Sequence, residues 1–283
     1  MAKSLMVLGT ASSVGKTVLT AGLCRVFTRK GLRVMPFKSQ NMSRFPYITE
    51  KGLRFSYAQA MQAEAAGVEP IAEMNPIWLN PQSESGSELW VLGECLGRYP
   101  AKEYYKMKKD LWPKVKEAYE SLSAQADLIL VEGAGSPAEL NLQQDDFVNL
   151  GLAERLGIPA ILLGDINRGG IFASLYGTIA LATEEQKKLY KGLVVNQFRG
   201  DQSLFASGVE ILEKICQRPV LGVVPMASFA LPEEDSLSIA DRGGQEETMS
   251  QEDREKAYDY LADHLEANLD MSKLEAIIEE GVL

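Results

Sequence analysis

Residues 9–17 read Gly9-Thr10-Ala11-Ser12-Ser13-Val14-Gly15-Lys16-Thr17. A short apolar run, Leu5 to Leu8, precedes this stretch, and a segment with the apolar spacing of a helix, Val18 to Phe27, follows it. A strand, a glycine-containing turn and a helix start, in this order, are the setting of a phosphate-binding loop. The backbone N–H groups of such a turn point at an anion, and the helix dipole favours negative charge there.

The residues of this loop have distinct expected roles. Lys16 adds a formal positive charge, and Thr17 offers its hydroxyl to a magnesium ion that bridges the phosphates. The common pattern has a glycine where Thr10 stands, and here the glycine comes one residue earlier, at Gly9. The loop is therefore a variant form, and an ordinary glycine-rich turn is the alternative interpretation. The residues predicted to hold a nucleotide are Gly9, Thr10, Ser12, Ser13, Val14, Gly15, Lys16 and Thr17.

Beyond the loop, apolar strand patterns alternate with helical patterns. This alternation predicts an α/β fold of the P-loop NTPase type, with a doubly wound, mostly parallel sheet, helices on both faces and a short C-terminal helical tail. Residues 74–100 are expected to be loops around a small hairpin at 88–94. The predicted strands are 5–8, 31–37, 126–131, 158–163, 192–195 and 220–225, and the predicted helices are 56–67, 104–122, 146–157, 171–188 and 203–216.

The composition changes near the C-terminal end. Residues 1–235 are expected to form the main ligase-like domain, and the acidic stretch 236–250 is predicted to be a linker. Residues 251–283 are predicted to form two helices, the first capped at Ser250 and the second at Asp270 or Ser272. A tail of this size cannot fold alone, so it is expected to dock on the main domain or on a partner.

Charge and cysteine usage exclude several function classes. The net charge of −10 argues against general nucleic-acid binding. No apolar run approaches the roughly 18–20 residues of a membrane span, and the first strand leaves no room for a signal peptide, so a cytoplasmic location without membrane association is expected. The three cysteines are widely separated, and His264 is the only histidine. A histidine-based relay or metal site is therefore not expected, whereas phosphoryl chemistry with lysine and magnesium is.

Two charged residues follow predicted strands directly. Lys38 comes after the second strand, and Glu132 comes after the strand at 126–131. Ligands bind at the carboxyl ends of such strands, so Lys38 is well placed for one, and Glu132 is a candidate magnesium-side acid. A solvated loop lysine and a structural turn carboxylate are the alternatives. Lys106, Lys108 and Lys109 are predicted to form a solvated helix face.

The ordered set of motifs resembles the N-terminal, ATP-binding part of the cobyric acid synthase family, which is related to dethiobiotin synthetase and cobyrinic acid a,c-diamide synthase. The resemblance spans about residues 3–240, and the ordered set is far more specific than the loop alone. The matching stretches are Gly9 to Thr17, Pro36 to Ser43, Ala58 to Pro70, Val131 to Leu142, Gly164 to Ala173, Phe198 to Asp201 and Leu231 to Ser236.

The resemblance implies ATP-dependent amidation of carboxylates on a corrin ring, such as that of adenosylcobyrinic acid a,c-diamide. It implies that Lys16 and a magnesium ion held by Thr17 and Glu132 stabilise the transferring phosphoryl group. By the same similarity, Lys38 bridges the carboxylate and the γ-phosphate, and Asn196 reads adenine. The candidate substrate contacts are Gln40, Asn41, Ser43, Glu139, Asn141 and Arg168.

The chain also departs from the family. Full-length members continue into a glutaminase domain, which is missing from this sequence, so ammonia is expected from solution or from a separate glutaminase subunit. The tail at 258–271 resembles the extreme C-terminus of the family. Arg54 stands where a carboxylate is expected, and Asn80 and Gln197 replace usual lysines. These changes lie on the expected substrate side and put a third magnesium-side carboxylate in doubt.

Several alternatives stay open at the level of sequence. The chain is either the corrinoid amide ligase, a dethiobiotin-synthetase-like ligase for another carboxylate or amine, or a non-catalytic paralogue. A partitioning or scaffold ATPase of the ParA/MinD kind ranks last, because the loop lacks the additional lysine near its start. The oligomeric state is open, with a homodimer among the options.

Overall fold

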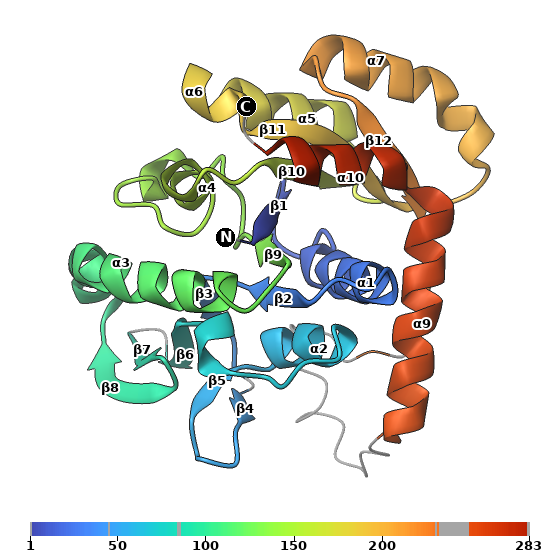
Figure 1. Cartoon of the computed structure of the whole chain (residues 1–283). Helices are drawn as coiled ribbons and strands as arrows, with labels where there is room; N and C mark the ends of the chain where they lie inside the picture. Colours follow the sequence, from blue (N-terminus) through green and yellow to red (C-terminus); the bar gives the residue numbers. More distant parts are fainter. Residues whose placement is uncertain (1, 45, 84–85, 230, 232–248, 282–283) are drawn as a thin grey trace.

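The computed structural model describes residues 2–44, 46–83, 86–229, 231 and 249–281 (Figure 1). Its central element is a six-stranded sheet in the order β12-β11-β10-β1-β9-β2, in which every neighbouring pair is parallel. The predicted α/β class with a mostly parallel sheet is confirmed. The strands are β1 (Lys3–Gly9), β2 (Val34–Phe37), β9 (Leu128–Glu132), β10 (Ala160–Asp165), β11 (Tyr190–Phe198) and β12 (Val220–Pro225).

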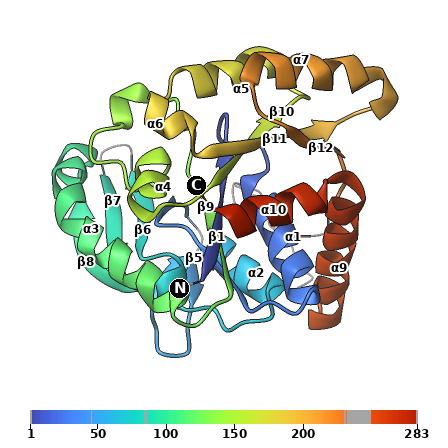
Figure 2. The ribbon, with the colours of Figure 1, turned by 45° about the horizontal axis from the view of Figure 1, so that its top comes forward.

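Helices cover both faces of the sheet, because each central strand is apolar on both sides. On β1, Leu5 and Val7 belong to the core under one helical layer, and Met6 and Leu8 belong to the core under the other. The first layer holds α1 (Lys16–Arg29), α2 (Tyr57–Ala65), α9 (Gln251–Asn268) and α10 (Met271–Glu280), and the second holds α3 (Ala101–Ser123), α4 (Leu150–Leu156), α5 (Ile171–Ala180) and α7 (Ala206–Cys216) (Figure 2).

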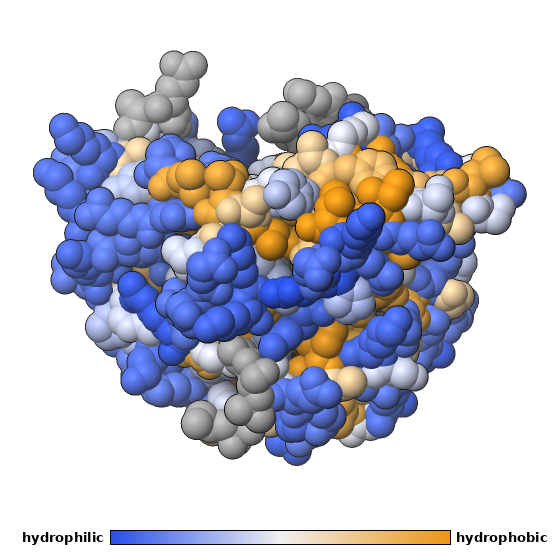
Figure 3. All heavy atoms as spheres, turned by 90° about the horizontal axis from the view of Figure 1, so that it is seen from above, coloured by the Kyte–Doolittle hydropathy of each residue, from blue (hydrophilic) through white to orange (hydrophobic). Residues whose placement is uncertain are grey.

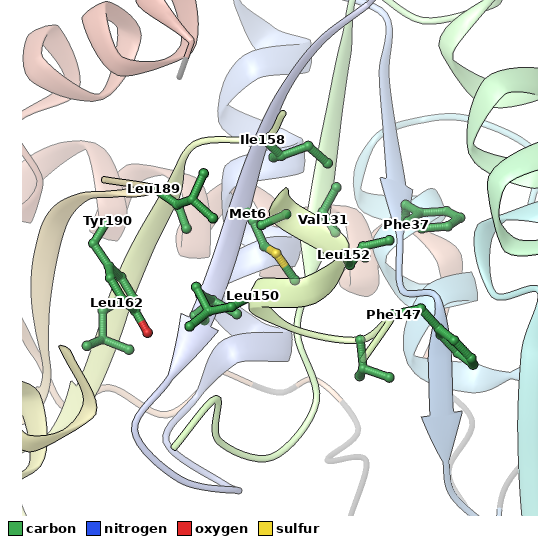
Figure 4. Packing of buried hydrophobic residues seen from close by; sticks show 14 of the residues in the cluster. Met6, Phe37, Val131, Phe147, Leu150, Leu152, Ile158, Leu162, Leu189 and Tyr190 are labelled. Carbon is green, nitrogen blue, oxygen red and sulfur yellow. The ribbon is translucent and has the colours of Figure 1, made fainter. Parts of the chain in front are cut away.

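The core of the second layer is packed from short elements as well as long ones. Figure 4 shows Leu150 and Leu152 of α4 lying against Met6 of β1 and Val131 of β9. All four side chains are almost completely buried. The loop that follows β9 is therefore anchored by α4 a short distance downstream.

The predicted hairpin at 88–94 underestimates the strands in this region. β6 (Ile77–Ser83), β7 (Gly86–Val91) and β8 (Glu94–Tyr99) form an antiparallel meander, and β3 (Gln40–Met42) pairs parallel with β6 to complete a second sheet. Pro, Gly and Ser in this stretch indicate turns locally, but cross-strand packing such as Trp78 against Trp90 overrides that signal. A two-stranded ribbon, β4 (Pro46–Ile48) with β5 (Arg54–Ser56), lies beside it.

Two predicted helices are interrupted. The helix expected at 171–188 ends at Ala180, and Thr183 starts α6 (Glu184–Lys187) with a capping box that includes Gln186. The helix expected at 203–216 begins as a 3₁₀ turn, η3 (Gln202–Phe205), before α7. Two further 3₁₀ turns are η1 (Ala72–Met74) and η2 (Leu140–Leu142).

The two C-terminal helices pack on the main sheet. Both predicted caps are present, because the side chains of Ser250 and Asp270 accept hydrogen bonds from the backbone N–H groups of Asp253 and Lys273. In Figures 1 and 2, α9 runs beside α1, and Arg25 of α1 pairs with Asp259 of α9 at 2.8 Å. Of the predicted linker 236–250, only residues 249 and 250 lie within the described residues.

The outer surface is not uniformly polar. The face in Figure 3 has a hydrophobic patch interrupted by hydrophilic side chains. Exposed apolar residues of the α5–α7 region include Tyr176, Leu204 and Ile211. Among the helices that the structure describes, none combines the length and the apolar character that a membrane crossing requires.

We predict opposite effects on stability for two helix glycines. A Cβ at Gly22 of α1 would lie 2.9 Å from Leu261 Cγ of α9 and closer still to Leu265, so Gly22→Ala is expected to lower the free energy of unfolding by about 1–2 kcal/mol. A Cβ at Gly177 of α5 would meet open space, so Gly177→Ala is expected to raise the free energy of unfolding by up to about 1 kcal/mol. Urea unfolding measures both. Equal stabilisation by the two changes would contradict the close α1–α9 packing.

Candidate functional site

The phosphate-loop residues connect β1 to α1. The N–H of Thr10 donates to the carbonyl of Leu163 at 2.9 Å, so this residue extends the pairing of β1 with β10. Gly15, with φ of 98°, is the residue before α1, and no side chain caps this end of the helix in the described structure. The first N–H groups of α1 therefore face the loop, which suits an anion. Ser12 and Ser13 are exposed at the turn.

Close contacts explain both glycines of the loop. A Cβ at Gly9 would lie 2.7 Å from Val14 Cγ2 and 2.9 Å from Lys16 Nζ. A Cβ at Gly15 would overlap the side-chain amide of Asn196. The close contacts therefore favour glycine at position 9, where the Lys16 side chain crosses the end of β1.

Lys16 folds back across the loop. Its Nζ donates to the carbonyl of Ala11 at 2.9 Å and to that of Gly135 at 3.0 Å. Gly135 lies after β9, so the lysine connects the phosphate loop to the segment that follows the neighbouring strand. The ammonium is largely buried and is held by neutral carbonyl oxygens at the place where phosphate is expected.

A buried carboxylate joins four elements at the base of the site. Glu132 ends β9, and its Oε1 accepts from Thr17 Oγ1 at 2.8 Å and from Lys38 Nζ at 2.8 Å. Its Oε2 accepts from Gln62 Nε2 of α2 at 2.5 Å. The Lys38 and Glu132 side chains are only 5% and 1% exposed. The structure therefore brings Lys38, Glu132 and Thr17 together, and adds Gln62, a helix residue that carried no local signal of a site role.

Three neighbouring cavities surround these residues. The central cavity is lined by Ser12, Lys16, Thr17, Lys38 and Glu132, among others. The second cavity shares Gly15, Val18 and Gln197 with it, and the third shares Met42, Ala134 and Gly135. The central cavity therefore lies between two outer cavities.

Asn196 lies in the second cavity, at the carboxyl end of β11. Its Nδ2 donates to the carbonyl of Val14 at 2.8 Å. The walls are largely apolar and include Leu261, His264 and Leu265 of α9. The C-terminal tail therefore forms part of a cavity beside the loop, which the sequence pattern did not indicate.

The third cavity, which we call the substrate-side cavity, has a volume of about 370 Å³ and contains two of the predicted substrate contacts, Gln40 and Glu139. The hydroxyl of Tyr104 on α3 donates to Gln40 Oε1. Lys108 also lines this cavity and is only 4% exposed, so its prediction as part of a solvated face is wrong. Its position, four residues after Tyr104 and three before Leu111, places it on the buried face of α3.

The other predicted substrate contacts lie elsewhere. Asn41 lines the central cavity, but its amide donates to Ser56 and to Gln59 Oε1. Ser43 is buried and accepts from Trp78 Nε1 at 3.1 Å. Asn141 is exposed in η2. Arg168 pairs with Asp165 at 3.1 Å at the end of β10, on the side of β1 away from β9 and β2. The structure therefore does not bring Ser43, Asn141 or Arg168 to the substrate-side cavity.

The positions that depart from the family pattern also separate in space. Arg54 is exposed and lies over the ring of Trp90, with 5.3 Å between Cζ and the ring centroid. Gln197 has φ of 59° and lines both the central and the Asn196 cavities. Within the described ranges, no three His, Cys, Asp or Glu side chains gather as a metal-binding group.

Comparison with known proteins identifies relatives. Residues 5–238 match the family described as "CobQ/CobB/MinD/ParA nucleotide binding domain". Cobyric acid synthase of Ruminiclostridium cellulolyticum is 52% identical over 84% of the chain and 46% of its own length, and that of Streptococcus sanguinis is 49% identical over 86% and 48%. The chain therefore spans about half the length of the curated relatives it matches.

Similar solved structures are more distant. The signal recognition particle receptor FtsY from Elizabethkingia anophelis has a TM-score of 0.45 and 16% identity, covering 91% of this chain and 63% of the receptor. The cell division protein MinD from Aquifex aeolicus has a TM-score of 0.41 and 16% identity, covering 94% and 97%.

We predict that the Lys38–Glu132 pair is coupled energetically. Lys38→Met leaves a buried carboxylate without its cation and is expected to lower the free energy of unfolding by about 3 kcal/mol. This value is at the low end for a buried pair, because both side chains line a cavity that water can enter. The double variant Lys38→Met/Glu132→Gln removes both charges and is expected to lose less than the single variant. Urea unfolding of the two variants and of Glu132→Gln tests this. Additive losses would contradict the coupling.

Proposed function

The chain belongs to the CobQ/CobB/MinD/ParA nucleotide-binding domain family, and on that premise we propose that it is an ATP- and magnesium-dependent amide ligase of cobalamin biosynthesis. Its proposed substrate is a corrinoid polycarboxylate of the adenosylcobyrinic acid a,c-diamide type. The observation that carries this proposal is the contact of Glu132 with both Thr17 and Lys38 between the two outer cavities. Relatives named cobyric acid synthase support the corrinoid.

In the proposed reaction, a carboxylate oxygen of the substrate attacks the γ-phosphorus of ATP, and the bond from that phosphorus to the bridging oxygen breaks to release ADP. Ammonia then attacks the carbonyl carbon of the acyl phosphate, phosphate leaves, and the nitrogen loses a proton. Both steps need positioning and charge neutralisation more than a general base. The buried ammonium groups of Lys16 and Lys38 supply positive charge to the cavity that Glu132 also lines.

The remaining roles follow from position. Thr17 Oγ1 and Glu132 Oε1 are adjacent hard oxygen donors, the kind that suits magnesium, which neutralises phosphate charge when bound. Asn196 would contact the adenine in the cavity that α9 helps to form. Gln40 and Glu139 would contact the corrinoid in the substrate-side cavity.

We further propose that ammonia reaches the site from solution or from a separate glutaminase subunit, and that the reaction occurs in the cytoplasm. Two of the three described thiols, those of the buried Cys24 and Cys216, do not favour a glutaminase nucleophile. Burial raises the pKa of Cys24 and that of Cys216, which disfavours the reactive thiolate. His264 is bonded through Nε2 to the carbonyl of Pro225.

The first test is phosphate release from ATP and Mg²⁺ in the presence of adenosylcobyrinic acid a,c-diamide, with and without ammonium. We expect release to require the corrinoid and mass spectrometry to detect successive conversion of its carboxylates to amides. Lys16→Ala is expected to lower kcat by about 10²- to 10³-fold because it removes a cation from the transferring phosphoryl group.

Lys106→Ala is the control, because this lysine is exposed on α3. ATP binding without any corrinoid-dependent turnover or amide formation would reject the corrinoid assignment. Turnover with a diamine and CO₂ in its place would instead favour a dethiobiotin-synthetase-like activity.

A further inference from the structure

Lys108 places a buried ammonium group on the wall of the substrate-side cavity. The residue is only 4% exposed, although its neighbours Lys106 and Lys109 on α3 are exposed. It does not line the central cavity that contains Lys16 and Lys38. Its ammonium therefore lies at the substrate-side cavity and not at the cavity of the phosphate loop.

The groups around Lys108 leave its ammonium without a direct anionic partner. Its Nζ lies 5.0 Å from the ring centroid of Phe147 and 5.7 Å from that of Tyr105, and within the described residues it makes no hydrogen bond or ion pair. The two nearby carboxylates are engaged elsewhere. Asp146 accepts from the backbone N–H groups of Val148, Asn149 and Gly151, and Asp145 lies 3.9 Å from Lys109 Nζ.

This arrangement is costly for a folded protein without a ligand. A buried ammonium loses hydration that aromatic rings replace only in part. The pKa of Lys108 is lowered overall, chiefly by desolvation. Asp146 and Asp145 act in the opposite direction, and Arg155 lowers the pKa further. An anion that entered the cavity would offset this cost.

The rest of the cavity wall indicates the kind of anion. Apolar side chains such as Met42, Leu79 and Val148 provide most of the exposed wall, and polar residues, among them Glu139 and Asp146, line the rest of the cavity. A small hydrophilic anion would gain little from such walls, whereas a large apolar body that carries carboxylates would use both the walls and the ammonium.

We propose that Lys108 binds a carboxylate of the substrate other than the one being phosphorylated, and so selects a large apolar polycarboxylate and orients it relative to the phosphate loop. This inference rests on the proposed function and adds to it a second anchoring point. The reacting carboxylate would lie toward Lys38, and the anchored one would lie against α3.

The test compares Lys108→Met with the matched control Lys109→Met, which alters the next residue of α3, whose side chain is 71% exposed. Calorimetric titration uses two ligands, adenosylcobyrinic acid a,c-diamide, which carries several free carboxylates, and adenosylcobyric acid, its more amidated counterpart, which carries a single one. Lys108→Met is expected to bind the polycarboxylate about 10- to 100-fold more weakly, as for loss of a charge-assisted hydrogen bond, and the control is expected to match the wild type. The two ligands should differ much less in affinity for Lys108→Met than for the wild type.

A second measurement separates the proposed role of Lys108 from a purely structural one. Under the proposal, Lys108→Met unfolds at the same or a higher temperature and its ATP affinity stays unchanged, because methionine has nearly the same shape as lysine and carries no charge. Weaker binding of both ATP and corrinoid, together with a lower melting temperature, would overturn the proposal.

Two further outcomes separate this inference from the proposed function. Equal corrinoid affinity of wild type and Lys108→Met would overturn the role of Lys108 and leave the ligase proposal intact. If the wild type binds no corrinoid, the same variants are titrated with coproporphyrin, a large apolar ring that carries several carboxylates. Loss of coproporphyrin binding in Lys108→Met alone would support the anion site, whereas equal affinity or no binding by the wild type would overturn it.

Discussion

The contact of Glu132 with its three donors is the interaction on which the site depends. One carboxylate at the end of β9 accepts from Thr17 at the start of α1, from Lys38 after β2 and from Gln62 on α2. These donors come from segments far apart in the sequence. Because an unpaired carboxylate is costly to bury, the three elements must reach their positions together. The same contact places a cation and a hydroxyl next to the phosphate loop.

The position of this contact follows from the order of the strands. β1 lies next to β9, and β9 lies next to β2, so the phosphate loop, Glu132 and Lys38 meet at one edge of the sheet. α1 is held at its start by the loop and along its length by α9, with Leu261 and Leu265 packed over Gly22. The C-terminal tail thus supports the helix whose first turn faces the loop, and it also lines the cavity around Asn196.

The sequence predicts those features that depend on local pattern. The loop, the parallel strands and the positions of Lys38 and Glu132 at strand ends follow from glycine positions, apolar runs and the rule that ligands bind at the carboxyl ends of parallel strands. Arg168 could not be placed in this way, because its location depends on β10 pairing with the far side of β1. The meander of β6, β7 and β8 was also missed, since tertiary pairing outweighs its turn-rich composition. Lys108 could have been recognised from its spacing to Tyr104 and Leu111, but its place in a cluster of lysines suggested a solvated face.

Among the buried lysines that the structure describes around the site, Lys38 and Lys108 have opposite electrostatic settings. Lys38 is compensated by Glu132, so its charge contributes to the folded state before any ligand binds. Lys108 has aromatic rings near its ammonium, and the adjacent aspartates are engaged by other donors. A fold under selection for stability alone would favour an apolar side chain at this position of α3. The anion proposed to bind in the cavity would offset the cost of this buried charge, and the apolar side chains beside it would favour an anion that belongs to a large molecule with more than one carboxylate.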